Sequence, residues 1–130
     1  MENLKKELPR FLIAGFSAVG MDLAVYYALF SSIGHSPAKT ISFLSGAIVA
    51  YVINKYWTFE KKEWSHLEII RFLTLYIFTL GVNVGINKLS LNIFDGLVLN
   101  YVFFAFLAAT AISTVLNFIG QKWWVFAHKE

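Results

Sequence analysis

The feature that most constrains this chain is a long uncharged segment near its C-terminus. No charged residue occurs from Gly96 to Gln121, and apolar side chains dominate the stretch. At about 1.5 Å rise per residue, a helix of this length crosses the roughly 30 Å hydrocarbon core of a bilayer. The segment therefore predicts a transmembrane helix.

The composition of the whole chain agrees with a membrane protein. Of its 130 residues, 58% are hydrophobic and 15% are charged, and the mean hydropathy is +0.61. Soluble domains are about 45–50% apolar. The alternative, a soluble helical bundle, should show polar stripes along its helices, and these segments are apolar nearly all round. The chain has no Cys, which excludes disulfide and thiolate chemistry.

Turn and capping signals divide the chain into four helices that form one domain, residues 1–130. Ser36-Pro37 is expected to begin the second helix, with Ser36 as its N-cap. Ser65 precedes Glu68 by three residues, which is a capping box for the third helix. Asp95 is expected to cap the fourth. The predicted spans are about 11–33, 37–57, 67–93 and 97–126.

The first two spans resemble the last two. Arg10-Phe11-Leu12 recurs as Arg71-Phe72-Leu73, 61 positions later, and Trp57-Thr58-Phe59 recurs in part as Trp124-Val125-Phe126, 67 positions later. A unit of two spans returns to its starting side, so the two units should be parallel repeats. The predicted fold is thus an all-α membrane protein made of two parallel-repeat helical hairpins.

The cations predict the orientation of these hairpins. Lys39 and Lys88 fall on one predicted side, and the other nine Lys and Arg residues fall on the opposite side. The positive-inside rule then places both termini and the central loop in the cytoplasm. This distribution accounts for the formal charge of +3 without a nucleic-acid partner. The nine are Lys5, Lys6, Arg10, Lys55, Lys61, Lys62, Arg71, Lys122 and Lys129.

Polar and basic residues gather at the predicted cytoplasmic ends of the spans. Trp and Tyr anchor a helix at the membrane interface, and Lys reaches the headgroups. Basic pockets between helices bind anionic lipid headgroups, and Arg fits the geometry of a phosphate. We therefore expect a ring that binds phosphate or headgroups, with ordinary interfacial anchoring as the alternative. Its residues are Arg10, Asn54, Lys55, Arg71, Asn117, Gln121 and Lys122.

An acidic residue, Asp22, lies near the middle of the first span. A carboxylate there costs at least ~2.5–3.5 kcal/mol, so it should face the bundle or a wet cavity. Two interpretations are open: a proton or headgroup site, or a hydrogen bond that fixes helix packing. Asn83, Asn87 and Lys88 in the third span complete a predicted intramembrane polar path. Lys88 either reaches the outer headgroups or pairs with Asp22 or a lipid phosphate.

Sequence motifs of catalysis and metal binding are absent. His35, His66 and His128 fall in loops or the tail and are too scattered to suggest a metal site. The chain has no G-x-S-x-G, Walker loop or paired-carboxylate motif. We therefore expect neither an enzyme nor a bound cofactor.

Taken in order, these motifs resemble the GtrA-like family of small four-span membrane proteins, over essentially the whole chain. In this overlay Ala50 stands where the second half has Asn117, so the two cytoplasmic ends need not be chemically equivalent. The matching motifs are Arg10-Phe11, Gly20 with Asp22, Asn54-Lys55-Tyr56-Trp57-Thr58-Phe59, Arg71-Phe72, and Asn117 with Lys122-Trp123-Trp124-Val125-Phe126.

The resemblance implies a role in cell-surface polysaccharide synthesis at the cytoplasmic membrane. Such proteins are thought to flip a polyprenyl-phosphate-linked sugar to the outer leaflet, where a membrane glycosyltransferase uses it. The rim cations would capture the phosphate, the polar path would bind sugar hydroxyls, and the polyprenyl tail would stay among the membrane lipids. One four-span bundle is small for such a path, so we predict a homo-oligomer, namely a dimer.

Two other functions compete with this interpretation. The chain could anchor or recruit a polyprenyl-phosphate glycosyltransferase without moving any lipid. It could also be a small proton-coupled exporter of cations, since such carriers pair four spans with one membrane carboxylate. Those carriers use a Glu in the first span, whereas this chain has Asp22 and a strongly cationic rim.

Overall fold

The computed structural model describes residues 2–63 and 65–127, and four helices of this part are long and apolar enough to cross a membrane. The predicted all-α membrane fold is therefore confirmed. The helices, in chain order, are α1 (Glu2–Ile33), α2 (His35–Ile53), α3 (His66–Phe94) and α4 (Tyr101–Gly120). Two short π-helical turns continue α2 and α4, namely η1 (Asn54–Thr58) and η2 (Gln121–Val125).

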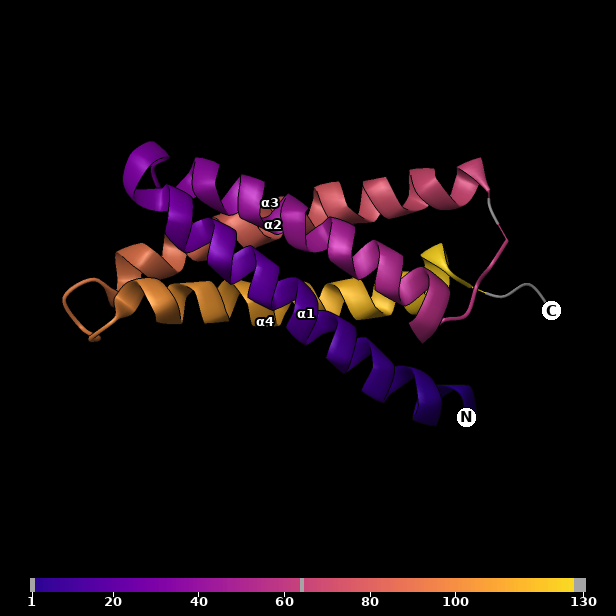
Figure 1. Cartoon of the computed structure of the whole chain (residues 1–130). Coiled ribbons are helices and arrows are strands. Elements are labelled where there is room, and N and C mark those ends of the chain that lie inside the picture. The colour runs from indigo at the N-terminus through magenta and orange to yellow at the C-terminus, as the bar shows by residue number, and fades with distance from the viewer. Residues whose placement is uncertain (1, 64, 128–130) are drawn as a thin grey trace.

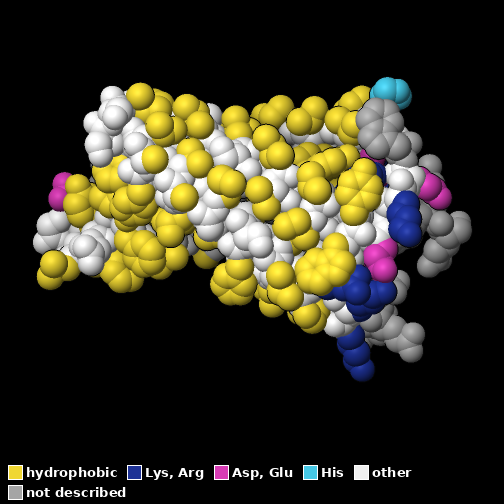
Figure 2. Space-filling view, in the orientation of Figure 1, with side chains coloured by type: hydrophobic (Ala, Val, Ile, Leu, Met, Phe, Trp, Pro, Cys, Tyr) yellow, Lys and Arg dark blue, Asp and Glu magenta, His cyan; other side chains and the backbone are white. Residues whose placement is uncertain are grey.

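The helices form two hairpins that lie side by side and run in the same sense (Figure 1). Hairpin one is α1 with α2 and η1, and hairpin two is α3 with α4 and η2. Both hairpins begin and end at the same end of the bundle, as parallel repeats require. We call this the basic end, and the other the turn end. The basic end gathers most of the Lys and Arg side chains (Figure 2). Lys129 and His128 lie outside the described residues.

The two turns differ from the predicted caps. Gly34 occupies the position before α2 with φ 90°, a backbone conformation that glycine adopts at little cost, so Ser36 lies inside the helix instead of capping it. Asp95 ends α3, its backbone N–H bonding the carbonyl of Leu91, and does not cap α4. The fourth helix begins at Tyr101 instead of residue 97, because the chain turns through Asn100 at φ 58°.

Both hairpins leave the bundle through the same local structure. The backbone N–H of Phe59 bonds the carbonyl of Asn54 at 2.9 Å, and that of Phe126 bonds the carbonyl of Gln121 at 2.8 Å. Each bond spans five residues, one more than in an α-helix, which widens the last turn. Single π-turns are rare and often lie at functional sites. Here they occur at equivalent positions of the two repeats.

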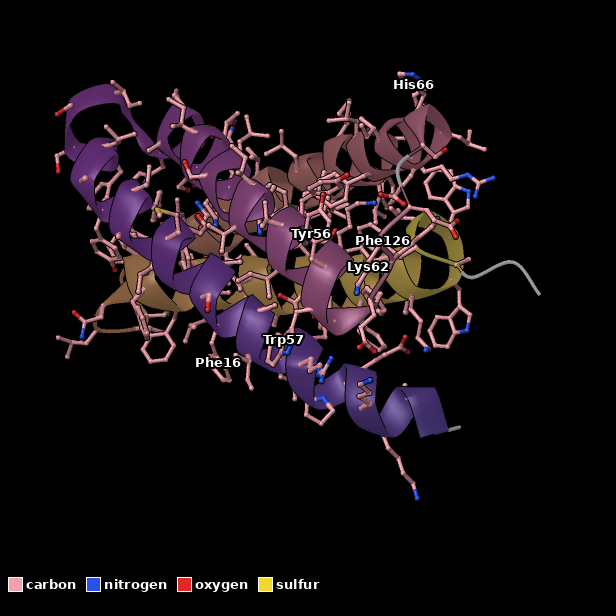
Figure 3. The ribbon with its side chains drawn as sticks, turned by 45° about the vertical axis from the view of Figure 1, so that its right-hand side comes forward. Phe16, Tyr56, Trp57, Lys62, His66 and Phe126 are labelled. Carbon is pink, nitrogen blue, oxygen red and sulfur yellow. The ribbon has the colours of Figure 1, made fainter. Side chains whose placement is uncertain are left out.

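The outer surface is apolar along the length of the bundle (Figure 2). Phe16 projects away from α1 and is 78% exposed (Figure 3). Ile48, Ile77 and Leu107 of the other helices are also exposed. Such a surface suits contact with lipid, where polar groups must find partners inside the protein.

The core has two parts. Toward the basic end, aromatic rings from both hairpins meet, and Phe59 stacks on its repeat equivalent Phe126 with ring centroids 5.6 Å apart. Toward the turn end, Tyr26 stacks on Phe106 at 5.6 Å. Within hairpin one the close approach depends on Gly46, where an added Cβ would lie 2.8 Å from the carbonyl oxygen of Ala18. The core thus joins the hairpins at both ends.

Candidate functional site

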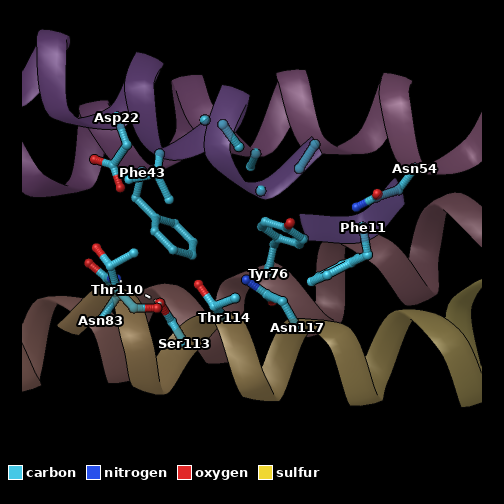
Figure 4. Close-up of a pocket in the computed structure, with 16 residues that line it drawn as sticks. Phe11, Asp22, Phe43, Asn54, Tyr76, Asn83, Thr110, Ser113, Thr114 and Asn117 are labelled. Atoms are coloured by element: carbon cyan, nitrogen blue, oxygen red, sulfur yellow. Dashed lines mark hydrogen bonds between the residues drawn. The ribbon is translucent and has the colours of Figure 1, made fainter. Parts of the chain in front are cut away.

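A small polar cavity lies between the two hairpins (Figure 4). Its volume is about 50 Å³. A water molecule needs about 10–15 Å³ of comparable space, so the cavity has room for a few water molecules but not for a sugar ring. Its polar lining comes from α1, η1, α3 and α4: Asp22, Asn54, Tyr76, Asn83, Thr110, Ser113, Thr114 and Asn117.

Asp22 is held by a buried ion pair that sequence reasoning missed. Its Oδ2 accepts a hydrogen bond from Lys39 Nζ at 2.8 Å, and the Lys39 side chain is fully buried. The ammonium also lies 3.9 Å from the centroid of the Phe106 ring, a cation–π contact between the hairpins. The sequence predicts Lys39 together with Lys88 on the side opposite the other nine cations. Instead it neutralises Asp22 inside the bundle.

The other residues of the predicted polar path separate into three environments. Asn83 lines the cavity and donates from Nδ2 to Ser113 Oγ at 2.8 Å (Figure 4). Asn87 is buried and donates to the hydroxyl of Tyr26 at 3.3 Å. Lys88 is exposed on α3 and makes no ion pair with any described residue. Lys39, and not Lys88, is therefore the partner of Asp22 in this structure.

Several oxygens around the cavity have no hydrogen-bond partner among the described residues. They are Oδ1 of Asp22, Oδ1 of Asn83, Oγ1 of Thr110 and Oδ1 of Asn117. Buried polar atoms are normally paired, and each of these four oxygens accepts hydrogen bonds. The cavity therefore offers binding positions to hydrogen-bond donors such as water or hydroxyl groups.

At the basic end, two equivalent amides join the hairpins. Asn54 Nδ2 donates to Gln121 Oε1 at 2.9 Å, and the two residues stand 67 positions apart in the chain. Asn54 Oδ1 accepts from Thr58, and Gln121 Nε2 donates to the hydroxyl of Tyr76 at 3.1 Å. Both amides are buried, so this pair joins the hairpins in the interior of the basic end, where Asn54 also lines the cavity.

The two predicted phosphate-binding lysines are already paired with carboxylates. Lys55 of η1 pairs with Glu68 at the start of α3, and Lys122 of η2 pairs with Glu7 at the start of α1. Each ion pair therefore joins one hairpin to the other. Glu68 follows its cap Ser65 as predicted, but its side chain turns to Lys55. The lysines thus fasten the bundle in this conformation.

Arg10 and Arg71 cover the ends of the π-turns. Arg10 donates to the carbonyl of Trp57 at 2.8 Å and Arg71 to that of Trp124 at 3.3 Å. Each guanidinium also faces the indole of the same Trp, at 5.1 Å and 5.9 Å from the ring centroid. Arg binds carbonyl groups at a helix C-terminus and stacks on aromatic rings. Six of the seven predicted rim residues thus lie together at the basic end, where Asn54 also lines the cavity, and Asn117 lies on α4 at the cavity.

Among the described groups outside the spans, the Glu60 carboxyl has a shifted pKa. Glu60, in the loop between the hairpins, accepts a hydrogen bond from Lys6 Nζ at 2.5 Å, and this bond lowers the pKa of the Glu60 carboxyl. Arg10 lies 3.7 Å from the same carboxylate. Lys6 and Glu60 are both about half exposed, so their ion pair belongs to the surface of the basic end and not to the cavity.

Three charged residues of the site were not among the predicted ones: Lys39, Glu7 and Glu68. The repeat carried a signal for the two acids, because they stand at the spacing that relates Arg10 to Arg71. The signal for Lys39 was its place inside a span that also packs against the span of Asp22. Among the described residues, no three His, Asp or Glu side chains cluster as a metal site would require.

The family model described as the GtrA/DPMS transmembrane domain matches residues 10–126. The chain belongs to this family. It is 32% identical to the uncharacterized membrane protein YngA of Bacillus subtilis (strain 168), over 93% of this chain and 80% of that protein. It is 22% identical to the uncharacterized membrane protein YwcD of the same strain, over 89% of this chain and 93% of that protein. No solved structure matches the chain.

Membership of the GtrA/DPMS family confirms the family resemblance and supports a membrane role in polysaccharide synthesis. Members of the family are generally non-catalytic membrane proteins. The match spans both hairpins, and hence the cavity and the paired residues of the basic end other than Lys6 and Glu7. The chain is a multi-pass membrane protein.

Proposed function

We propose that this protein flips a polyprenyl-phosphate-linked sugar across the cytoplasmic membrane for the glycosylation of a cell-surface polysaccharide. The observation that carries the proposal is the polar cavity between the hairpins, whose unpaired acceptor oxygens lie in the membrane-spanning part of the bundle. Ionisable side chains such as Asp22 are costly inside a membrane span, and they commonly mark substrate or ion pathways.

The two groups of polar residues suit the two parts of such a substrate. Arg10, Arg71, Lys55 and Lys122 lie at the basic end, where a phosphate would arrive if this end faces the cytoplasm. Asp22, Asn83 and the other cavity acceptors suit sugar hydroxyls. The apolar outer surface leaves the polyprenyl tail in contact with membrane lipids. Because the cavity holds about 50 Å³, the hairpins have to move apart to admit a sugar.

The test is translocation of a polyprenyl-phosphate sugar in proteoliposomes, followed with an impermeant reagent on the outer leaflet. We expect the wild-type protein to expose the sugar faster than empty vesicles do. Asp22→Asn and Lys122→Ala should slow exposure by about tenfold or more, the factor that one charge-assisted hydrogen bond is worth. Asp95→Asn in the turn and Lys62→Ala in the loop are matched controls that keep the wild-type rate. Exposure no faster than in empty vesicles contradicts the proposal.

A second candidate function is an assembly protein that anchors a polyprenyl-phosphate glycosyltransferase without moving lipid. The paired state of Lys55 and Lys122 and the small cavity favour it, because both describe a closed bundle. In that case Asp22→Asn preserves glycan modification in cells while the protein still inserts and binds its transferase.

Under either function we propose a glycosyltransferase partner and a homodimer, which crosslinking in native membranes would detect. Crosslinking that traps monomer alone contradicts the dimer.

A further inference from the structure

The ion pairs of the basic end are exchanged between the hairpins. Lys55, at the end of hairpin one, takes its carboxylate from the start of hairpin two, and Lys122, at the end of hairpin two, takes its carboxylate from the start of hairpin one. The lysines are equivalent positions of the repeat, as are Glu68 and Glu7. Two copies of one contact therefore fasten the hairpins at this end.

The two copies differ in burial and in the number of their partners. The side chains of Lys55 and Glu68 are completely buried, and Lys55 also donates to the carbonyl of Glu63 at 2.8 Å. Glu68 has a further cation, Lys61, at 3.2 Å. The Lys122 side chain is 15% exposed, and Glu7 is its one ion-pair partner among the described residues. The Lys122–Glu7 pair is thus the more accessible of the two.

A lipid phosphate is chemically able to replace either carboxylate as the partner of its lysine. A sugar esterified to polyprenyl phosphate carries one negative charge, the same as a carboxylate, and binds Lys through the same kind of charge-assisted hydrogen bond. A phosphate on Lys122 would therefore replace Glu7 without changing the net charge at the lysine. The released Glu7 is near the start of α1, at the membrane surface, where water can solvate it.

Resting on the proposed function, we infer that the anionic headgroup displaces Glu7 from Lys122 and thereby separates α1 from η2. The Lys55–Glu68 pair keeps the other side joined, so the bundle opens along the side where α1 meets α4. The Phe11 and Phe118 rings, 4.7 Å apart, lie on this side. Phe11 also lines the cavity, so separation here gives the headgroup access to it. Glu7 is then a positioning residue that couples phosphate binding to opening.

The test measures the distance between the hairpins directly. The chain has no Cys, so spin labels can be placed at Leu12 on α1 and Ile119 on α4, both half exposed. Pulsed electron paramagnetic resonance is recorded for the full chain in lipid nanodiscs. Farnesyl phosphate, a monoester that is at least as anionic as the diester of a lipid-linked sugar, is the probe. Farnesol tests the need for the phosphate, and inorganic phosphate tests the need for the lipid.

In the wild-type protein, farnesyl phosphate should add a longer distance and farnesol should not. An equal response to inorganic phosphate assigns the site to free phosphate and overturns the lipid part of the inference. Glu7→Gln should show the longer distance without ligand, or lower the half-effective farnesyl phosphate concentration about tenfold. Asp95→Asn, the same change at the turn end, should behave as wild type.

Two lysine variants separate binding from folding. Lys122→Gln should abolish the change in distance that farnesyl phosphate causes. Lys122→Arg, which keeps the charge, should retain this change. A distance distribution that stays unchanged in the wild-type protein and in Glu7→Gln overturns the inference. Because this measurement needs no transport, opening without translocation would contradict the proposed function and leave the coupling intact. Translocation without opening would support the proposed function and contradict the coupling.

Discussion

The two hairpins contribute the same contacts to the basic end but different contacts to the membrane interior. At the basic end, Asn54 meets its own repeat equivalent Gln121, and each lysine meets a carboxylate of the other hairpin. In the interior, hairpin one carries the Asp22–Lys39 ion pair, whereas the equivalent positions of hairpin two hold Asn83 and Phe106.

This difference separates the contacts that both hairpins make from those that one hairpin makes alone. The contacts at the basic end, namely Asn54–Gln121, Lys55–Glu68 and Lys122–Glu7, form the seam between the hairpins. The seam joins two hairpins of the same kind, so each hairpin supplies the same set of partners. The interior needs one charged site, and hairpin two supplies the surface that receives it: Phe106 lies against the Lys39 ammonium at 3.9 Å, and Asn83 lines the cavity with Asp22. The seam holds the repeat together, and the diverged interior forms the candidate site.

The largest expected effect comes from breaking the interior ion pair. Lys39→Met should leave the buried Asp22 carboxylate without its cation and destabilise the protein by about 3–5 kcal/mol. The double variant Asp22→Asn with Lys39→Met, which resembles hairpin two, should recover most of this loss. Thermal stability of purified protein in detergent measures both. Equal stability of Lys39→Met and the wild type contradicts the buried pair.

The next effect concerns the close approach inside hairpin one. Gly46→Ala should destabilise by about 1–3 kcal/mol, because the added Cβ would lie 2.8 Å from the carbonyl oxygen of Ala18 and the helices must shift. Gly81→Ala is the matched control on α3, where an added Cβ meets nothing within 4 Å. It should keep or slightly raise the stability, since Ala favours helix over Gly. The same loss in both variants would show that the effect is not one of packing.

A comparable effect is expected from the amide pair Asn54–Gln121 at the basic end. Asn54→Ala should cost about 1–3 kcal/mol, because it leaves a buried Gln121 oxygen unpaired. Gln121→Ala should cost a similar amount, and the double variant less than the sum, since the two share one contact. A double-mutant cycle of thermal stability measures the coupling. Additive losses would indicate that the two amides act independently.

The smallest effect concerns Glu60 at the surface of the basic end. The hydrogen bond from Lys6 lowers the pKa of Glu60 in the folded protein, so the ionised form stabilises the fold above the usual carboxyl range. This contribution is lost as the pH falls through the folded-state pKa. Glu60→Gln should lower the melting temperature slightly at neutral pH and not at all at low pH. A difference that grows on acidification would contradict this sign.

Much of the fold followed from the sequence. Apolar length predicted the four helices, and the recurrence of Arg10-Phe11 and Trp57-Thr58-Phe59 predicted two hairpins in parallel. The predicted start of α4 at residue 97 was wrong. Leu97-Val98-Leu99 is apolar enough for a span, but the left-handed backbone of Asn100 prevents the helix from beginning before Tyr101. Local hydropathy does not report such a turn.

The candidate site was less accessible to sequence reasoning. Asp22 stood out because a carboxylate is rare in a span, but its partner Lys39 sits near a helix start, where a lysine usually reaches the surface. Whether Lys39 points outward or toward Asp22 depends on how α1 packs on α2. Likewise the sequence predicted Lys55 and Lys122 as unpaired cations, because their partners Glu68 and Glu7 belong to the other hairpin. Tertiary packing decides both cases.

The central claim is that the hairpins separate at the basic end to admit a lipid-linked sugar. The most direct measurement replaces Phe11 and Phe118 by Cys, joins them with a short cleavable thiol crosslinker, and follows translocation in proteoliposomes. We predict that crosslinking stops translocation and that cleavage of the linker restores it, with the single-Cys variants unaffected by the reagent. Translocation by the crosslinked protein at the rate of the uncrosslinked one would contradict the claim.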